Sequence, residues 1–492
     1  MTRKKLLMFA LCLLVIQFSF AQQPGEISYK DISSLPEGIK GERIQSLIKA
    51  VNSSDPEVIS RFVNENFTKR FIDIAPMGEH VDIFTGIFDQ SGGVDFHSIR
   101  TYTPERKDQT VVIVKDRLFS SWRAFVIYFE ERPESLMAGL QFTDARVPSN
   151  VTEAPLSEKE LVPAVQKIIR QMKDKNIFSG TVLLAKGRDV LFTDTGGEAS
   201  KRFHVPNNID TKFNLGSMNK MFTSLCIMKL AEEGKISLDD SLNTFLDETW
   251  LPEEVSSKIT IHHLLSHTSG LGSYFNEEYD RSSRNLFRAL DDYKPLIRDD
   301  RPAFEPGERF QYSNTGMFLL GAVIEKVTGQ DYFSYVRENI YEPAGMENTD
   351  CYEMDYPVEN LAIGYSPDRK SHYGWQNNLY KHVIKGGPAG GGFSTVGDLH
   401  SFGVALLEGK LVSGESLEKM WTDQAGEGYG YGFTLLETAK GMVIGHGGGF
   451  SGINSNLDVF VDSGYIVAVM SNIDQGASPL ARKIRELISN IE

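Results

Sequence analysis

Ser217 and Lys220 are three residues apart in the stretch FNLGSMNKMF, whose other residues are mostly apolar. A serine hydroxyl is a poor nucleophile until a base removes its proton. A lysine can act as that base only where burial or a neighbouring cation keeps its amine neutral. Because the apolar neighbours favour burial of Lys220, the pair is a candidate nucleophile and base for acyl transfer.

The S-x-x-K spacing does not identify a site by itself, because it also occurs at residues 46–49 and 416–419. We interpret both of these copies as surface positions on helices, since no other candidate site residues accompany them. Ser217 instead lies where a predicted strand region leads into a helix that runs to Glu233. The N–H groups at a helix start have no partner in the helix, and the helix dipole favours negative charge there. This position therefore suits a nucleophile.

Two further motifs follow the serine and the lysine along the chain. The segment FEPGERFQYSNTGMFLLGAVIE places Tyr312 and Asn314 in a loop just before an apolar helix. The segment VIGHGGGFSG places the tripeptide HGG, which begins at His446, after a strand predicted over residues 442–444. The stretches ITIHHLLSHTSGL and GPAGGGFSTVGDL lie between the first and the last of these motifs.

In this order and setting the three motifs resemble those of the serine β-lactamase and penicillin-binding family. The resemblance is closest to the class C β-lactamases, the D-peptidases and the related esterases, and it extends over about residues 155–490. It implies an α/β fold of the β-lactamase-like kind, in which an α-helical lobe is inserted into an α/β sandwich domain. It also implies that a ligand binds in a cleft between the sheet and the lobe.

The resemblance implies a catalytic role for three residues. Ser217 is expected to accept the acyl group, Lys220 to act as its base or proton relay, and Tyr312 to pass a proton to the leaving group as a second general base. Four residues are expected to bind substrate: Asn314, His446, Gly448 and Gly449. Asn314 resembles the residue that hydrogen-bonds the substrate amide. The backbone N–H groups of Ser217 and Gly449 are expected to form the oxyanion hole.

His446 departs from the family pattern, because many β-lactamases have a lysine there. A lysine is a fixed cation for a substrate carboxylate, whereas a histidine is largely neutral near pH 7. We therefore expect a serine hydrolase that cleaves amide or ester bonds in small molecules or short peptides, including peptides with D-amino acids, and that uses no cofactor. Two alternatives remain open: a true β-lactamase, and a penicillin-recognising sensory protein that binds without turnover.

Three histidines and a glycine run could suggest other chemistry. His263 and His267 are spaced to share a helix face next to His262, but the glutamate of an H-E-x-x-H zinc motif is missing. We interpret these histidines as packing residues and expect no metal site. The run 386–392 lacks the G-K-S or G-K-T ending of a phosphate-binding loop, so we interpret it as a tight turn into a helix.

The first residues are typical of a signal peptide. Three cationic residues stand at positions 3–5, and an apolar run follows from Leu6 to Phe20. Small residues at Ser19 and Ala21 then form a cleavage site. We expect cleavage after Ala21 and export to the periplasm or the cell exterior. Removal of residues 1–21 takes three positive charges and changes the formal net charge from −15 to −18, which argues against nucleic acid as a partner. No later segment is apolar and long enough for a stable membrane span.

At 492 residues the chain is long enough for two folded domains. Residues 22–147 have two short helices followed by four strand-like runs, which predicts a small α+β domain. Its element order resembles the nuclear-transport-factor-2-like (NTF2-like) kind. A polar linker is predicted over residues 148–156, and the hydrolase domain over residues 157–490. The sequence does not indicate an oligomeric state.

Overall fold

A computed structural model describes residues 28–106, 109–368 and 371–492. The predicted signal peptide, residues 1–21, lies outside these described residues. The chain divides into two compact units, Met1–Leu156 together with Glu492, and Ser157–Ile491. In the described part of the chain no helix is both long and apolar enough to cross a membrane.

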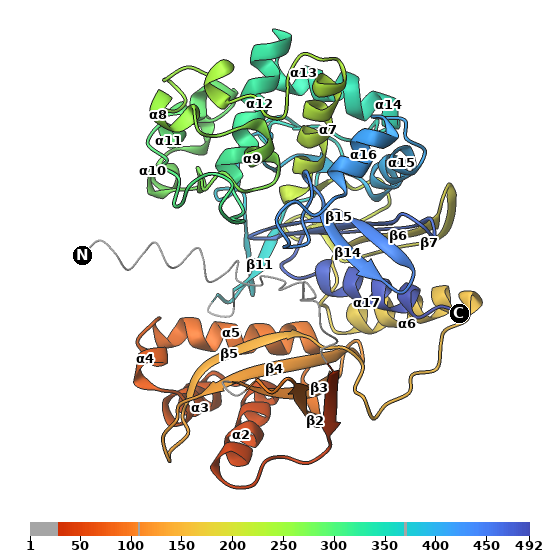
Figure 1. The fold of residues 1–492 in the computed structure, drawn as a ribbon. Coiled ribbons are helices and arrows are strands. Elements are labelled where there is room, and N and C mark those ends of the chain that lie inside the picture. The colour runs from red at the N-terminus through yellow and green to blue at the C-terminus, as the bar shows by residue number, and fades with distance from the viewer. Residues whose placement is uncertain (1–27, 107–108, 369–370) are drawn as a thin grey trace. The chain divides into compact units, whose positions relative to one another are not determined.

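The first unit combines helices with an antiparallel sheet, as the sequence predicts (Figure 1). The five strands that the structure describes in it pair in chain order, from β1 to β5. Its elements are β1 (Ser28–Ile32), α2 (Ile39–Ser53), α3 (Pro56–Asn66), α4 (Lys69–Ile72), α5 (Met77–Ser91), β2 (Val94–Thr103), β3 (Thr110–Asp116), β4 (Trp122–Phe129) and β5 (Met137–Asp144). Helix α3 begins where the Asp55 carboxylate accepts hydrogen bonds from two helix amides, with Pro56 at the first position.

Strand β1 is held in place by a buried ion pair. The Arg100 Nε lies 3.0 Å from the Asp31 carboxylate, and both side chains are at most 3% exposed. The same carboxylate accepts a hydrogen bond from the backbone N–H of Ser149 at 2.7 Å. Part of the segment 148–156 is therefore bonded to the sheet of the first unit.

The second unit confirms the predicted sheet with an inserted helical lobe. Its largest described sheet has six strands in the order β14-β15-β16-β17-β6-β7, and neighbouring strands are antiparallel. Strands from the start and the end of the unit meet where β17 pairs with β6. The long segment between them supplies the lobe.

The elements of the second unit follow in chain order. Up to the end of the first long lobe helix they are α6 (Glu158–Asp174), β6 (Gly180–Lys186), β7 (Asp189–Gly196), β8 (Glu198–Ser200), β9 (Val205–Pro206), β10 (Phe213–Asn214), η1 (Gly216–Met218) and α7 (Asn219–Glu232). The rest of the lobe has η2 (Leu242–Thr244), α8 (Glu253–Ser256), α9 (Ile261–Leu265), α10 (Glu277–Arg281), η3 (Arg284–Leu286), η4 (Leu290–Tyr293), α11 (Lys294–Ile297), α12 (Asn314–Thr328), α13 (Tyr332–Val336), η5 (Arg337–Tyr341) and α14 (Glu342–Ala344). The last part has β11 (Tyr365–Pro367), β12 (Trp375–Asn377), β13 (Phe393–Ser394), α15 (Val396–Leu407), α16 (Gly414–Met420), β14 (Thr434–Thr438), β15 (Gly441–Phe450), β16 (Ile453–Phe460), β17 (Tyr465–Ser471) and α17 (Ser478–Ser489).

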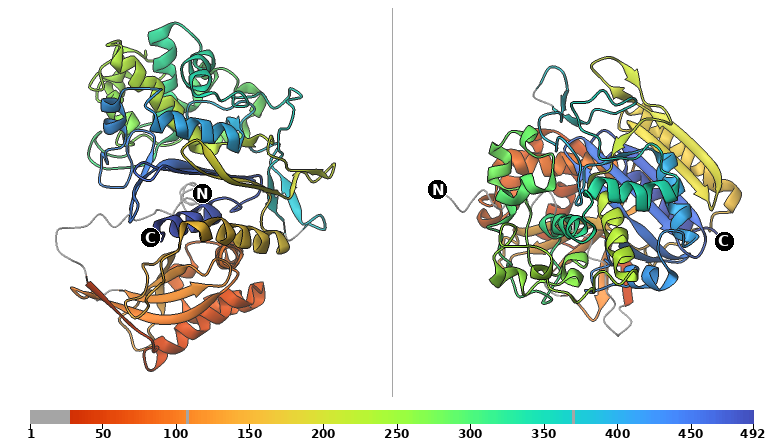
Figure 2. Two further views of the ribbon diagram at one scale, coloured as in Figure 1. Left: turned by 90° about the vertical axis from the view of Figure 1, so that its right-hand side faces the viewer. Right: turned by 90° about the horizontal axis from the view of Figure 1, so that it is seen from above.

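Helices cover both faces of the six-stranded sheet. Helices α6 and α17 pack against each other on one face, where α17 contacts β16 and β17. Helix α15 packs on β6 and β17, and Figure 2 shows it on the opposite face, together with the lobe. One apolar core joins the two parts, including Leu183 of β6, Phe222 of α7 and Phe402 of α15. This shared core therefore holds the residues at the junction of the sheet and the lobe in place.

Strand β15 is longer than the sequence predicts. The prediction that HGG follows a strand ending at residue 444 was wrong, because β15 continues through His446 to Phe450. Glycine is depleted in strands, so the pattern alone suggests an early end. Pairing with β16 along the whole segment extends the strand. Strand β14 pairs only as far as Gly445, so the β14-side edge of β15 is not covered by β14 from His446 onward.

Candidate active site

Ser217 lies in a tight junction between a short strand and a helix. Strand β10 pairs with β13, and the 3-10 turn η1 then leads into α7. Gly216 has a φ of +51°, and a Cβ built on it would lie 2.8 Å from the backbone N of Gly449. A glycine is required for this conformation and this approach. The backbone of the half-buried Ser217 is therefore held beside strand β15.

Lys220 is fully buried, and two acceptors hold its amine. Its Nζ donates to Oδ1 of Asn314 at 2.9 Å and to the carbonyl of Ala389 at 2.5 Å. Burial holds the pKa of Lys220 well below its ordinary value, which favours the neutral amine. A neutral amine has two N–H bonds and one lone pair. Because both N–H bonds have acceptors, the lone pair of the neutral amine is not used by either of these two bonds.

Tyr312 packs against this amine. The Lys220 Nζ lies 4.8 Å from the centroid of the Tyr312 ring, and the Tyr312 hydroxyl is hydrogen-bonded to Ser217. Burial raises the pKa of Tyr312, and the bond to Ser217 offsets part of this rise. Tyr312 is therefore a neutral phenol at ordinary pH, and it can donate its proton.

The turn that carries Tyr312 and Asn314 is fixed by the residue between them. Ser313 is fully buried and caps helix α12, while its hydroxyl donates to the carbonyl of Gly272 at 2.9 Å. The Nδ2 of Asn314 donates to the Ser273 hydroxyl at 3.3 Å. An amide nitrogen has two N–H bonds, so the Asn314 amide can also donate to a ligand.

The free edge of β15 supplies a backbone donor beside Ser217. The carbonyl of Gly445 accepts a hydrogen bond from the Thr434 hydroxyl of β14 at 3.0 Å, so its main-chain groups point toward β14. The N–H and C=O groups of successive residues in a strand point to alternate sides, so those of Gly449 point to the same side as those of Gly445. At the level of Gly449, strand β14 has already ended. Gly449 is exposed, and Ser217 stands at the start of a helical turn. The backbone N of Gly449 therefore lies beside the backbone that leads into Ser217.

His446 is buried and uncharged. Its Nδ1 lies 2.6 Å from the carbonyl of Gly447, which can only accept, so Nδ1 carries the proton and donates. Its Nε2 then accepts a hydrogen bond from the Tyr429 hydroxyl at 3.1 Å. Burial and the nearby Lys220 lower the pKa of His446 to about 3, although the bond to Gly447 acts in the opposite direction. The strand beside Ser217 therefore presents no cation at this position.

The glycine run is tied to the residue that precedes Lys220. The Asn219 side chain is fully buried; it donates to the carbonyl of Gly387 at 3.2 Å and accepts from the amide of Gly392 at 3.1 Å. These bonds hold the loop between them, so that the carbonyl of Ala389 meets the Lys220 amine. The predicted tight turn thus carries an acceptor for Lys220 that the sequence did not reveal.

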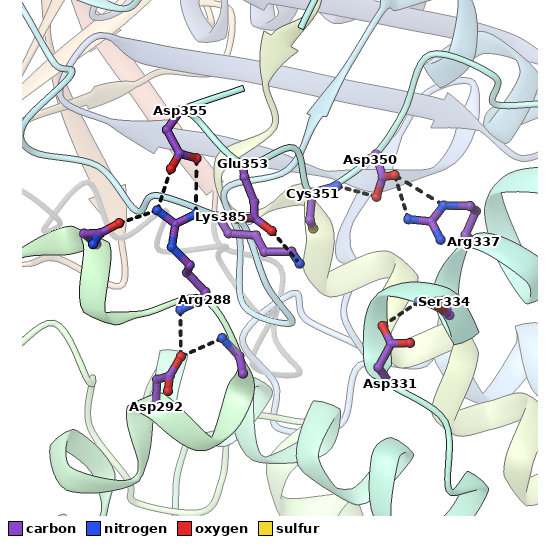
Figure 3. A network of polar contacts seen from close by, with 12 residues as sticks. Arg288, Asp292, Asp331, Ser334, Arg337, Asp350, Cys351, Glu353, Asp355 and Lys385 are labelled. Atoms are coloured by element: carbon purple, nitrogen blue, oxygen red, sulfur yellow. Dashed lines mark hydrogen bonds and ion pairs between the residues drawn. The ribbon is translucent and has the colours of Figure 1, made fainter. Parts of the chain in front are cut away.

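An ion-pair network fixes the start of this loop (Figure 3). Lys385 lies 3.4 Å from the carboxylate of Glu353, to which it is also linked by a β-bridge. Arg288 of the lobe pairs with the same Glu353 and, at 2.6 Å, with Asp355. The residues just before the glycine run are therefore anchored to the lobe.

The three histidines of the segment IHHLLSH do not share one ligand site. Helix α9 ends at Leu265, so the prediction that His263 and His267 share a helix face was wrong. Their Nδ1 atoms have separate partners: the Tyr431 hydroxyl for His262 at 2.7 Å, the Thr260 amide for His263 at 3.2 Å, and the Ser313 amide for His267 at 3.2 Å. Over the described residues, no group of three or more histidine, cysteine or acidic side chains is placed to hold a metal ion.

The structure brings the seven predicted site residues together at the junction of the sheet edge and the lobe. They are Ser217, Lys220, Tyr312, Asn314, His446, Gly448 and Gly449. The other two S-x-x-K copies lie on helices α2 and α16. Four contributors were not predicted: the side chains of Asn219, His267 and Tyr429, and the carbonyl of Ala389.

Known proteins share this arrangement of elements. The model of the Beta-lactamase family matches residues 165–489. "Penicillin-binding protein 4*" of Bacillus subtilis (strain 168) is 30% identical over 328 residues, which are 63% of this chain and 72% of that protein. A penicillin binding protein from Bacillus halodurans has 32% identity and a TM-score of 0.59, covering 64% of this chain and 97% of its own. A D-stereospecific amidohydrolase from Streptomyces sp. has 28% identity and a TM-score of 0.53, covering 62% and 92%. The chain therefore belongs to the Beta-lactamase family.

Proposed function

We propose that this protein is an exported serine hydrolase that cleaves amide or ester bonds through an acyl-enzyme on Ser217. The observation that carries the proposal is the buried amine of Lys220, whose two N–H bonds are taken by Asn314 and Ala389. Family membership supports the same chemistry. The similarity to a D-stereospecific amidohydrolase supports amides, including those of D-amino acids, as substrates.

Acylation follows from the positions of three side chains. The Lys220 lone pair takes the proton of Ser217 while the serine oxygen forms a bond to the substrate carbonyl carbon. The backbone N–H groups of Ser217 and Gly449 stabilise the negative oxygen, and such donors typically contribute about 3 kcal/mol each. When the bond to the leaving group breaks, Tyr312 gives its proton to the leaving nitrogen or oxygen and receives one from Lys220. In deacylation, water attacks the ester, and its proton returns to Ser217 by the same route.

The neutral His446 limits the substrate class. A β-lactam carries a carboxylate, which binds favourably where the enzyme presents a cation. His446 has a pKa of about 3 and uses its Nδ1 proton for Gly447, so it does not supply that cation. We therefore place amides and esters that lack a carboxylate near the scissile bond ahead of β-lactams. Asn314 is proposed to donate its Nδ2 to the acyl-side carbonyl of the substrate.

A labelling experiment tests the proposed nucleophile. A fluorophosphonate probe is expected to label the wild-type protein on Ser217 and not to label Ser217→Ala. Persistent labelling of the variant would contradict the assignment. The predicted signal peptide supports export to the periplasm or beyond, and the mass of the mature N-terminus measures whether cleavage follows Ala21.

A substrate comparison separates the proposal from its alternatives. We expect a short p-nitrophenyl ester and a D-amino-acid p-nitroanilide to have a kcat/KM at least about tenfold above that of a chromogenic cephalosporin. Strong cephalosporin turnover alone would identify a β-lactamase instead. Stoichiometric labelling of Ser217 by penicillin without turnover of any substrate would favour a sensory binding protein.

A further inference from the structure

His267 occupies a position behind the proposed catalytic tyrosine. Its side chain is fully buried, and its ring centroid lies 4.4 Å from that of Tyr312 and 4.8 Å from that of Tyr429. Its Nδ1 accepts a hydrogen bond from the backbone N–H of Ser313 at 3.2 Å. Ser313 stands between Tyr312 and Asn314, so His267 contacts the turn that carries both residues.

The bond to Ser313 explains why a histidine stands here. Since Nδ1 accepts, the proton of the neutral ring must be on Nε2, and among the described residues that buried Nε2 has no hydrogen-bond partner. An unpartnered buried N–H is unfavourable, and an apolar ring would fill the same space without it. The backbone of His267 is also in the left-handed region, at a φ of +58°, where few non-glycine residues are found. The accepting Nδ1 is the feature that an apolar residue could not supply.

The acceptor works only while the imidazole is neutral, because a protonated ring has no free lone pair. Burial and the neighbouring Lys220 and His446 hold the pKa of His267 well below its ordinary value. The aromatic rings that face His267 are those of Phe310, Tyr312 and Tyr429, and both tyrosines have raised pKa values. Burial, the largest cause of the lowered pKa of His267, therefore favours its neutral form.

We propose that His267 is a positioning residue: its Nδ1 holds the Ser313 amide, and thereby orients the Tyr312 hydroxyl and the Asn314 amide toward Ser217. This inference rests on the proposed function of that site. Ser313 is fully buried, so its N–H has no ready access to water as a substitute partner. Loss of the acceptor is expected to loosen the turn on both sides of Ser313, which would misplace a proton donor and a substrate contact together.

Two substitutions separate the acceptor from the ring. His267→Asn keeps an acceptor near the position of Nδ1, removes the ring, and suits the left-handed backbone. His267→Phe keeps a ring and removes the acceptor. We expect His267→Phe to lower kcat/KM by about a hundredfold, with kcat falling and KM rising, because a displacement of about 1 Å has this effect on catalysis. We expect His267→Asn to stay within about fivefold of the wild type.

His262→Asn is the matched control, since His262 belongs to the same segment but bonds to Tyr431. It is expected to leave kcat and KM unchanged. Wild-type kinetics for His267→Phe, or equal losses in the Phe and Asn variants, would overturn the proposal. If the Phe variant does not fold, His267→Ala takes its place as the variant without an acceptor. Failure of wild-type Ser217 to react with a fluorophosphonate would instead contradict the proposed function, whatever the His267 variants do.

Discussion

Two serine and lysine pairs in this chain have the same spacing and opposite surroundings. Lys220 is fully buried, and its amine is held by Asn314 and Ala389. The Lys419 side chain is 54% exposed and pairs with Glu415 one turn earlier on helix α16. Both lysines follow a serine by three residues, so spacing alone does not distinguish them.

The two pairs differ in burial and not in spacing, so burial is what distinguishes the proposed base Lys220 from Lys419. Water stabilises an exposed ammonium group, whereas burial without a carboxylate partner favours the neutral amine. The serines differ too. Ser217 is hydrogen-bonded to Tyr312, whereas the buried Ser416 donates to the Glu232 carboxylate at 2.5 Å and serves to attach α16. We propose proton transfer for the first pair, whereas the serine of the second pair bonds to Glu232 and contributes to packing.

The largest expected difference between the two pairs comes from replacing each lysine with methionine. Lys220→Met removes the base and should lower kcat/KM by about a thousandfold, within the usual range for general base catalysis. Lys419→Met should change kcat/KM by less than about twofold, because it alters only an exposed ion pair. Steady-state kinetics with a p-nitrophenyl ester measure both. Similar losses in the two variants would remove the distinction between the pairs.

The serines should show the reverse pattern when stability is measured. Ser416→Ala removes a hydrogen bond from a buried hydroxyl and should lower the free energy of unfolding by about 1 kcal/mol, with activity unchanged. Ser217→Ala should abolish activity while changing the free energy of unfolding by less than about 0.5 kcal/mol. Urea denaturation of both variants provides the comparison. A Ser416→Ala protein that loses activity at full stability would assign that serine a role outside packing.

The sequence predicted the parts of the molecule whose signals are carried by side chains. The buried Lys220, the Tyr312 turn and the division into sheet and inserted lobe follow from apolar patterning and ordered motifs, and the fold confirms them. Helix α5 was missed because Gly78 and Gly86 weaken its helical pattern. Strand β1 was missed because it is five residues long and largely exposed.

Other features depend on tertiary contacts that no local pattern reports. The acceptor at Ala389 is a backbone carbonyl, which every residue has, and it meets Lys220 only because Asn219 holds the loop. The neutral state of His446 follows from its burial and from Lys220, which is 226 positions earlier in the chain but close in space. The role of His267 requires knowing that its ring reaches the turn at Ser313.

The pH dependence of Ser217 labelling by a fluorophosphonate tests the central claim most directly. In the proposed mechanism the neutral Lys220 amine is the base, so the labelling rate should rise with pH through the lowered pKa of Lys220 and reach a plateau well below the ordinary lysine value of 10.5. His446 and His267 are already neutral in this range, and Lys220→Met should remove the step. A rate that rises without a plateau up to pH 10.5 would show that Lys220 is an ordinary charged lysine and would contradict the account.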